Sequence, residues 1–217
     1  FDKSGSSYTL KGNIPHYVSE SNTQPGMPKY KDLNGDGVID TNDRTMIGRG
    51  LPIHTGGFTN NFEYKGFDLS VFFQWSYGND VLNANRLFFD SGFQKKRELN
   101  QYASYTDRWT PENPNSNIPA ATNSSSNLVI SSRVVEDASF LRLKTVTLGY
   151  TVPKTFLKKY KIDNARLYVA AQNLWTITGY SGYDPEVSIR SGGLTPGLDF
   201  SSYPRALSVS FGINLGF

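Results

Sequence analysis

The chain has 217 residues, of which 37% are hydrophobic, 19% charged and 14% aromatic, and this balance excludes both a disordered tail and an apolar helical membrane protein. The net charge is only +3, and no basic stripe with interleaved aromatic residues is present, so nucleic acid is not an expected partner. Disulfide and thiol chemistry are excluded because the sequence contains no cysteine.

The abundance of aromatic residues favours strands over helices. The sequence has 13 Tyr and 14 Phe, which pack well on a pleated surface, and 20 Gly and 11 Pro, which favour turns. No segment approaches the roughly 18 consecutive apolar residues of a spanning helix, so a membrane role would require a β-barrel. Because the sequence starts at Phe1 without Met or a signal peptide, we expect a fragment of a longer protein.

Residues 1–56 are predicted to form a loop region with one short strand near Tyr8–Leu10. Within it, residues 32–43 fit the pattern of a Ca²⁺-binding loop, with oxygen-bearing residues at loop positions 1, 3, 5, 9 and 12 and a glycine at position 6. Calcium takes about six to eight oxygen ligands, which a short acidic segment can supply. The predicted ligands are Asp32, Asn34, Asp36, Asp40 and Asp43 through their side chains and Val38 through its backbone carbonyl.

The predicted Ca²⁺ would have a structural role, holding an extracellular loop. Position 12 is Asp43 rather than Glu, so its bidentate reach is shorter and the expected affinity is modest. The side chain of Ile39 is expected to point into a neighbouring core. The alternative is a polar Asx-turn that only looks like a calcium loop.

Residues 57–217 are predicted to contain five antiparallel strands, separated by the extracellular loops 76–132 and 178–204. A short helix is expected around Val81–Phe89, and one or two helical turns with exposed lysines over Pro153–Ile162. The expected strands are 57–64, 67–75, 139–151, 165–177 and 206–217, of which the first two are joined by a tight turn at Lys65-Gly66.

The last of these segments has the clearest pattern. From Leu207 to Phe217 apolar residues alternate with Ser, Gly and Asn, which suits a strand with one face on lipid and the other on a wet lumen. A half-buried strand of a soluble sheet gives the same alternation, so this segment alone leaves both interpretations open. With Phe217 on the periplasmic side, every short connection falls on that side and every long one outside the cell, which favours the outer-membrane barrel.

Three stretches resemble SusC/RagA-type TonB-dependent transporters. They are VEDASFLRLKTVTLGYTVP at Val135–Pro153, ARLYVAAQNLWTITGYSGYDPE at Ala165–Glu186 and YPRALSVSFGINLGF at Tyr203–Phe217. The upstream stretches KYKDLNGDGVIDTNDRTMIG and FEYKGFDLSVFFQWSYGND look like the same family, so the resemblance runs from about Lys29 to Phe217.

The resemblance implies an all-β fold, in which this chain supplies the C-terminal strands of a transmembrane barrel of about 22 strands in the bacterial outer membrane. It also implies a plug domain outside these residues, a SusD-like surface lipoprotein as lid, and energy from the TonB complex. The substrates of the family are typically oligosaccharides or peptides. Five strands cannot close a barrel, so they must pair with the rest of the barrel chain.

No nucleophile elbow, phosphate loop or metalloprotease motif is present, so we do not expect an enzyme. Neither His16 nor His54 has a partner at metal-ligand spacing. The alternative to a transporter is a secreted β-rich carbohydrate-binding or adhesion module with a dockerin-like calcium loop. Four carboxylates are expected to form salt bridges or hydrogen bonds: Glu136, Asp137, Asp184 and Glu186. The loop aromatics could stack on sugar rings or contact the lid protein, but the favoured roles are loop packing or a place in the girdle at the membrane interface, where Trp75 and Trp175 are also expected. These loop aromatics are Tyr102, Tyr105, Trp109, Tyr180 and Tyr183.

Overall fold

The computed structural model describes residues 1–5, 7–19, 22–92, 100–122, 125–189 and 196–217. The chain divides into two compact units. Residues 1–48 and 82–135 form the first, called here the loop unit, and residues 49–81 and 136–217 form the second, called here the sheet unit. None of the described helices combines the length and the apolar character needed to cross a membrane.

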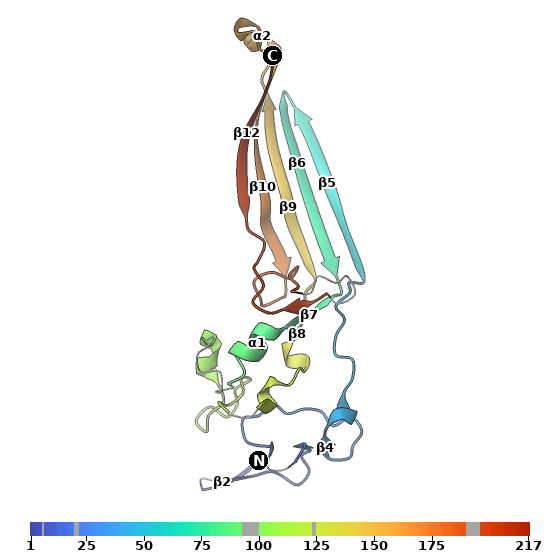
Figure 1. The fold of residues 1–217 in the computed structure, drawn as a ribbon, viewed down its shortest axis with the longest axis vertical. Coiled ribbons are helices and arrows are strands. Elements are labelled where there is room, and N and C mark those ends of the chain that lie inside the picture. Colours follow the sequence, from blue (N-terminus) through green and yellow to red (C-terminus); the bar gives the residue numbers. More distant parts are fainter. Residues whose placement is uncertain (6, 20–21, 93–99, 123–124, 190–195) are drawn as a thin grey trace. The chain divides into compact units, whose positions relative to one another are not determined.

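The sheet unit is built on a five-stranded antiparallel sheet with the order β12-β10-β9-β6-β5 (Figure 1). A strand is present at each of the five places where alternation predicts one, and its ends differ from expectation by at most three residues. The strands are β5 (His54–Tyr64), β6 (Phe67–Tyr77), β9 (Phe140–Thr151), β10 (Asn164–Thr178) and β12 (Ser208–Gly216).

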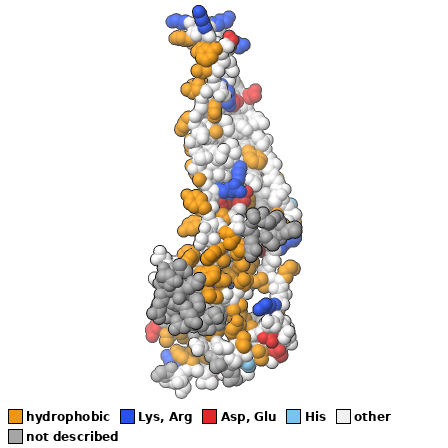
Figure 2. All heavy atoms as spheres, viewed as in Figure 1, with side chains coloured by type: hydrophobic (Ala, Val, Ile, Leu, Met, Phe, Trp, Pro, Cys, Tyr) orange, Lys and Arg blue, Asp and Glu red, His pale blue; other side chains and the backbone are white. Residues whose placement is uncertain are grey.

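The connections at one end of this sheet are short. Lys65 and Gly66 join β5 to β6 with φ angles of 47° and 87°, the two positive values of a type I′ hairpin turn. A Cβ at residue 66 would lie 2.9 Å from the backbone oxygen of Thr151, so glycine is required there for space as well. Between β9 and β10 the chain forms α2 (Lys154–Leu157) and η7 (Lys158–Tyr160), where Figure 2 shows the lysine side chains gathered.

Two register shifts lie opposite the same short segment of β9. The pairing of β6 with β9 shifts between Phe72 and Phe73, and the pairing of β10 with β9 shifts between Gln172 and Trp175. Both shifts fall opposite the segment from Leu143 to Thr145. Such bulges bend the strand and change the direction of nearby side chains.

A smaller sheet has the order β11-β7-β8 and consists of β11 (Leu198–Asp199), β7 (Asp80–Asn83) and β8 (Val135–Asp137). Beside it, Val81, Ala138 and Tyr180 form a buried apolar cluster of the sheet unit. The hydroxyl of Tyr180 donates to Asp199 at 2.7 Å, so this buried phenol is paired.

The loop unit contains only short elements. β1 pairs with β2 antiparallel, and β3 pairs with β4 in parallel, which brings Tyr17 opposite Ile39. Ile39 is 7% exposed and therefore points into a core, as expected from the sequence. The elements are β1 (Asp2–Ser4), β2 (Ser7–Thr9), β3 (His16–Tyr17), β4 (Val38–Ile39), η2 (Thr41–Asp43), α1 (Ala84–Phe89), η4 (Ala103–Asp107), η5 (Ser125–Leu128) and η6 (Ser132–Val134).

Candidate functional site

One face of the five-stranded sheet carries apolar side chains on all its strands, with Asn60 of β5, opposite Val71, as an exception. The register places Phe58 opposite Phe73, where the ring centroids are 4.8 Å apart, and Val169 opposite Phe211, which is 82% exposed. A continuous exposed apolar surface of this kind marks a face that meets lipid or a partner. Its side chains are Phe58, Phe62, Tyr64, Phe67, Leu69, Val71, Phe73, Trp75, Leu141, Leu143, Val146, Leu148, Tyr150, Leu167, Val169, Trp175, Ile177, Val209, Phe211, Ile213 and Leu215.

The opposite face is polar, and β12 contributes small residues to it. On β12, Ser210 lies opposite Ala170 and Gly212 lies opposite Tyr168. A Cβ at Gly212 would overlap the Tyr168 ring, so the glycine leaves room for the ring to lie across the strand. The two faces thus have the contrast expected of strands that separate lipid from water.

Arg166 and Asp68 form an ion pair across the polar face. Arg166 Nε donates to Asp68 Oδ1 at 3.0 Å, and Nη2 donates to Oδ2, so the contact is bidentate. Gly149 lies on the strand between them, and a Cβ there would meet both charged groups. Both side chains are about one-third exposed, at 28% and 32%.

Arg142 of β9 is the centre of a buried ion-pair cluster on the polar face. Its Nη2 donates to Asp184 at 2.5 Å, its Nη1 to Glu186 at 3.1 Å, and its Nε to Thr176 of β10 at 2.9 Å. The side chains of Arg142 and Asp184 are 3% and 4% exposed. The cluster therefore fastens the segment that follows β10 to the sheet.

Asp184 is kept ionised by the donors that surround it. Burial raises the pKa of this carboxyl, but the hydrogen bonds from Arg142 and from the backbone N–H groups of Arg205 and Glu186 lower it, and the net pKa lies below the usual 3.8. Glu186 also pairs with Arg205 at 2.9 Å and with Lys144 at 3.5 Å. Because both carboxylates are held by cations, the cluster is suited to anchoring and not to acid–base chemistry.

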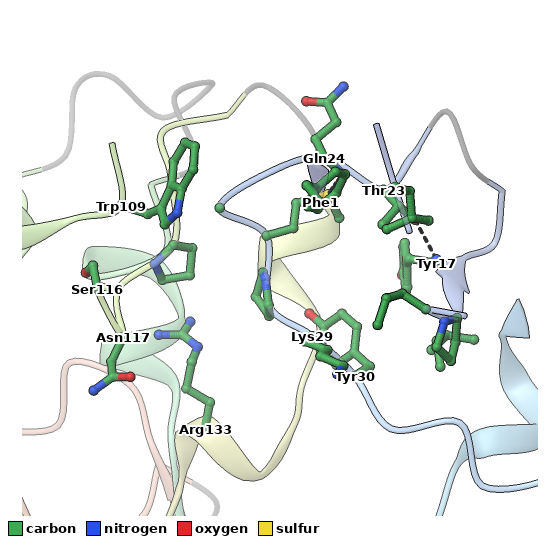
Figure 3. A pocket seen from close by; sticks show the side chains of 18 of the residues that line it. Phe1, Tyr17, Thr23, Gln24, Lys29, Tyr30, Trp109, Ser116, Asn117 and Arg133 are labelled. Carbon is green, nitrogen blue, oxygen red and sulfur yellow. Dashed lines mark hydrogen bonds between the residues drawn. The ribbon is translucent and has the colours of Figure 1, made fainter. Parts of the chain in front are cut away.

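A pocket of about 490 Å³ lies within the loop unit (Figure 3). Figure 3 shows Trp109, Asn117 and Arg133 on one side of the pocket and Tyr17 and Tyr30 on the other. Aromatic and proline side chains dominate its walls, and a few polar groups interrupt them. Burial, with a smaller effect of Tyr17, raises the pKa of Tyr30 to about 12, so its hydroxyl remains protonated.

The acidic segment 32–43 forms a compact turn whose side chains bind backbone amides. Asp32 accepts from Gly35 at 2.6 Å and from Gly37 at 2.9 Å, and Asp36 accepts from Val38 at 2.8 Å. The remaining predicted ligands also accept from backbone amides: Asn34 from Asp36, Asp40 from Asn42, and Asp43 from Leu33 and Asp40.

These hydrogen bonds bear on whether the segment fits a metal ion. They lower the pKa of Asp43, so this carboxylate is ionised, as a calcium ligand must be. Among the residues that the structure describes, however, no group of three or more acidic or histidine side chains is arranged to hold a metal ion. Calcium binding by this turn therefore stays a prediction.

The other sequence-predicted residues are dispersed. His54 accepts a hydrogen bond from Trp75 at 3.0 Å on the apolar face, and His16 lies in β3 of the loop unit. Glu136 accepts from both the backbone and the hydroxyl of Ser181, so the expected hydrogen bonding of the first carboxylate pair is confirmed. The expected aromatics also separate: Tyr105 stacks with Arg108, Tyr102 packs on Phe89, Trp109 lines the pocket, Tyr180 is buried, and Tyr183 and Trp175 are exposed.

The roles of four residues, Arg142, Arg166, Asp68 and Arg133, were not expected from the sequence. Salt bridging by Asp184 and Glu186 was predicted and is confirmed, but Arg142 as their partner was not. Arg142 could have been suspected as their partner, because it is a charged residue near the otherwise apolar beginning of β9. The pairing of Arg166 with Asp68, and the position of Arg133 in a pocket, depend on segments far apart in the chain and have no local signal.

No family model matches the chain. TonB-dependent receptor P3 of Formosa agariphila is 38% identical over 213 residues, which are 95% of this chain and 21% of that protein. TonB-dependent receptor SusC of Bacteroides thetaiotaomicron is 28% identical over 201 residues, 92% of this chain and 18% of that protein. The solved structure of the RagAB peptide transporter matches with a TM-score of 0.71 and 28% identity, covering 88% of this chain and 20% of that chain.

The chain spans about a fifth of the length of the curated relatives that it matches. The similarity nevertheless extends over nearly all of its own residues. The antiparallel sheet with few helices corresponds to part of a RagA/SusC barrel, and it is not closed within these residues. Over nearly their whole length, these 217 residues are therefore similar to one part of SusC- and RagA-type TonB-dependent receptors.

Proposed function

We propose that this chain is part of an outer-membrane transporter that imports oligosaccharides or peptides with energy from the TonB complex. The observation that carries the proposal is the five-stranded sheet with one continuous apolar face and one continuous polar face. In a bilayer the apolar face meets lipid, and the polar face lines a wet or plugged lumen. Similarity to SusC and to a peptide transporter supports import over passive flow.

The sheet requires further strands at both of its edges. Among the residues that the structure describes, β5 and β12 each pair on one side only, and an open sheet edge is not tolerated in hydrocarbon. We infer that the remainder of the transporter pairs with both edges and closes the barrel. The long connections over residues 76–132 and 178–204 would then be extracellular loops, and a SusD-like lipoprotein would act as the lid on that side.

Deletion of the gene in the source bacterium tests this function. Growth would be measured with oligosaccharides or with peptides of several lengths as the limiting nutrient, and uptake would be followed with and without an uncoupler of the proton gradient. We expect loss of growth on one substrate class and loss of its uptake when the gradient is dissipated. Normal uptake in the deletion strain, or uptake that persists without the gradient, would contradict active import.

Cell fractionation separates the transporter from the secreted binding module. A transporter is recovered with the outer membrane after washing in high salt and chelator. A secreted module would be released into the medium or removed by the wash.

A further inference from the structure

The pocket in the loop unit has the composition of a small-molecule site. Its volume of about 490 Å³ lies within the range of ligand sites, which are mostly apolar and carry a few convergent polar groups. Trp109, Tyr17 and Tyr30 supply ring surfaces, and Gly26 allows Trp109 to lie close to the backbone because a Cβ there would overlap the indole. A ligand with a flat or apolar face fits such walls.

Arg133 is a half-buried cation on the wall of this pocket. It lies in η6, whose neighbouring residue Val134 is fully buried and fixes the backbone. Both terminal guanidinium nitrogens of Arg133 are shielded from solvent, and neither has a hydrogen-bond partner in the described part of the chain. Burying a charged group whose N–H donors have no acceptor is costly, so these nitrogens require an acceptor.

Asp90, the nearby carboxylate, does not accept a hydrogen bond from the terminal nitrogens of Arg133. Asp90 lowers the cost of the charge at a distance, but its carboxylate pairs with Arg86 at 3.6 Å and accepts from Ser104 at 3.1 Å. Burial has the larger effect and lowers the pKa of Arg133 from its usual value. The described residues that line the pocket include Arg133 and Lys29 but no Asp or Glu, so the pocket attracts an anion.

We propose that this pocket binds a ligand carrying a carboxylate, with the carboxylate on Arg133 and a ring or apolar face of the ligand against Trp109. The guanidinium presents parallel N–H donors that match the two oxygens of a carboxylate. Figure 3 shows Arg133 and Trp109 on the same side of the pocket, so the proposed ligand would lie along that side.

A carboxylate of this kind has two sources among importable nutrients: a uronic-acid sugar and the C-terminus of a peptide. Only the fate of the bound ligand, its import into the cell, rests on the proposed function; the binding itself does not. Binding is measured on the purified protein, separately from uptake, so failure of one does not imply failure of the other.

Isothermal titration of the intact, detergent-solubilised transporter tests the site. The probes are digalacturonic acid and its dimethyl ester, and an N-acetylated tripeptide with a free carboxylate and its C-terminal amide. We expect at least one acid to bind more than tenfold more tightly than its neutral counterpart. The acid that does so identifies the source, and this comparison uses the unaltered protein.

Three variants connect the binding to Arg133. Arg133→Gln should weaken the acid at least tenfold while leaving the neutral counterpart unchanged, and Arg133→Lys should weaken it less because the charge is kept. Arg44→Gln removes an exposed arginine from the same unit, outside the pocket, and should leave the affinity unchanged. The proposal is overturned if neither acid binds better than its neutral form, or if a folded Arg133→Gln variant binds the acid as the unaltered protein does.

Discussion

At the residue scale, Arg142 is the side chain whose loss should be most damaging. It is nearly fully buried, and it binds Asp184, Glu186 and Thr176. Replacement by methionine would leave Asp184 as a buried carboxylate without its cation, and breaking a buried pair costs about 3–5 kcal/mol. We therefore expect Arg142→Met to lower the melting temperature of the intact transporter in detergent, measured by differential scanning fluorimetry.

Arg205→Met is the matched control, because Arg205 pairs with the same Glu186 but its side chain is 49% exposed. Such exposed pairs contribute about 0–1 kcal/mol, so the control should melt close to the unaltered protein. Equal losses in the two variants would contradict the importance given to the buried pair.

The same ion pair predicts a pH dependence. The pKa of Asp184 is depressed in the folded protein, so its stabilising effect is complete above the ordinary value of 3.8 and is lost as pH falls through the lower folded value. In Arg142→Met, acidification instead neutralises a carboxylate that lacks its cation. The difference in melting temperature between the two proteins should therefore narrow below about pH 4. A difference that is constant from pH 7 to pH 3 would be inconsistent with an ionised Asp184.

Asp36 provides the test of the predicted calcium turn. Asp36→Asn keeps an oxygen that can accept from Val38 but removes one charge from the ligand set. If calcium binds, a concentration 100-fold above Kd stabilises the fold by about 2.7 kcal/mol, and the substitution should reduce this. Melting would be compared in calcium and in chelator, with the exposed Asp107→Asn as control; an equal effect of Asp36→Asn in both buffers would argue against a bound ion.

The sequence could predict this turn because its residues lie within one short segment with a fixed pattern. It could not predict the Arg142 cluster in the same way. Arg142 and Asp184 are 42 residues apart, and only the pairing of β9 with β10 and the return of the following loop bring them together. Local spacing contains no information about such a contact.

At the scale of single elements, β12 offers a direct comparison of the two sheet faces. Phe211 lies on the apolar face and Ser210 on the polar face. An arginine facing the middle of a bilayer costs about 2–4 kcal/mol, whereas an arginine facing a wet lumen can remain hydrated. We expect Phe211→Arg to reduce the folded fraction in the outer membrane far more than Ser210→Arg, measured by the heat-dependent mobility of the barrel in gel electrophoresis.

If an arginine at residue 210 clashed with its neighbours, Ser210→Arg would also reduce the folded fraction. Ser210 lies opposite the small Ala170, so an arginine there has room. If Ser210→Arg were the more damaging substitution, the apolar face would not be the one in contact with lipid.

The strands themselves were predictable, because period-two alternation reports directly which side chains share a face. The single exception in β6, Phe72, is explained by Gly57 on the paired strand: the ring covers the space where a side chain is missing. The beginning of β5 was missed because Gly56 and Gly57 interrupt the pattern, although Trp75 and Phe72 lie over them. Bulges were not predicted, since one extra residue is visible only when two strands are compared.

At the scale of the whole molecule, the loop unit was the least predictable part. Residues 76–132 were expected to form an extracellular loop with a short helix around Val81–Phe89, and the structure has several short helical turns within residues 82–135, which form one compact unit with residues 1–48. The unit has a core without long periodic elements, because its buried residues come from separate short elements, such as Ile39 from β4 and Leu87 from α1. Periodicity cannot reveal a core of that kind.

The edges of the five-stranded sheet lead to a prediction about the intact transporter. Within these residues β9 is paired on both sides, whereas β5 and β12 are each paired on one side. If the remainder of the barrel pairs with both edges, all three strands have their amides in hydrogen bonds and should exchange slowly with deuterated solvent. Hydrogen-exchange mass spectrometry of the full-length protein in detergent would compare peptides from β5, β9 and β12 with the described residues of the loop between β10 and β12. Exchange in β5 or β12 as fast as in that loop would mean that the edge is open and that the barrel does not close through it.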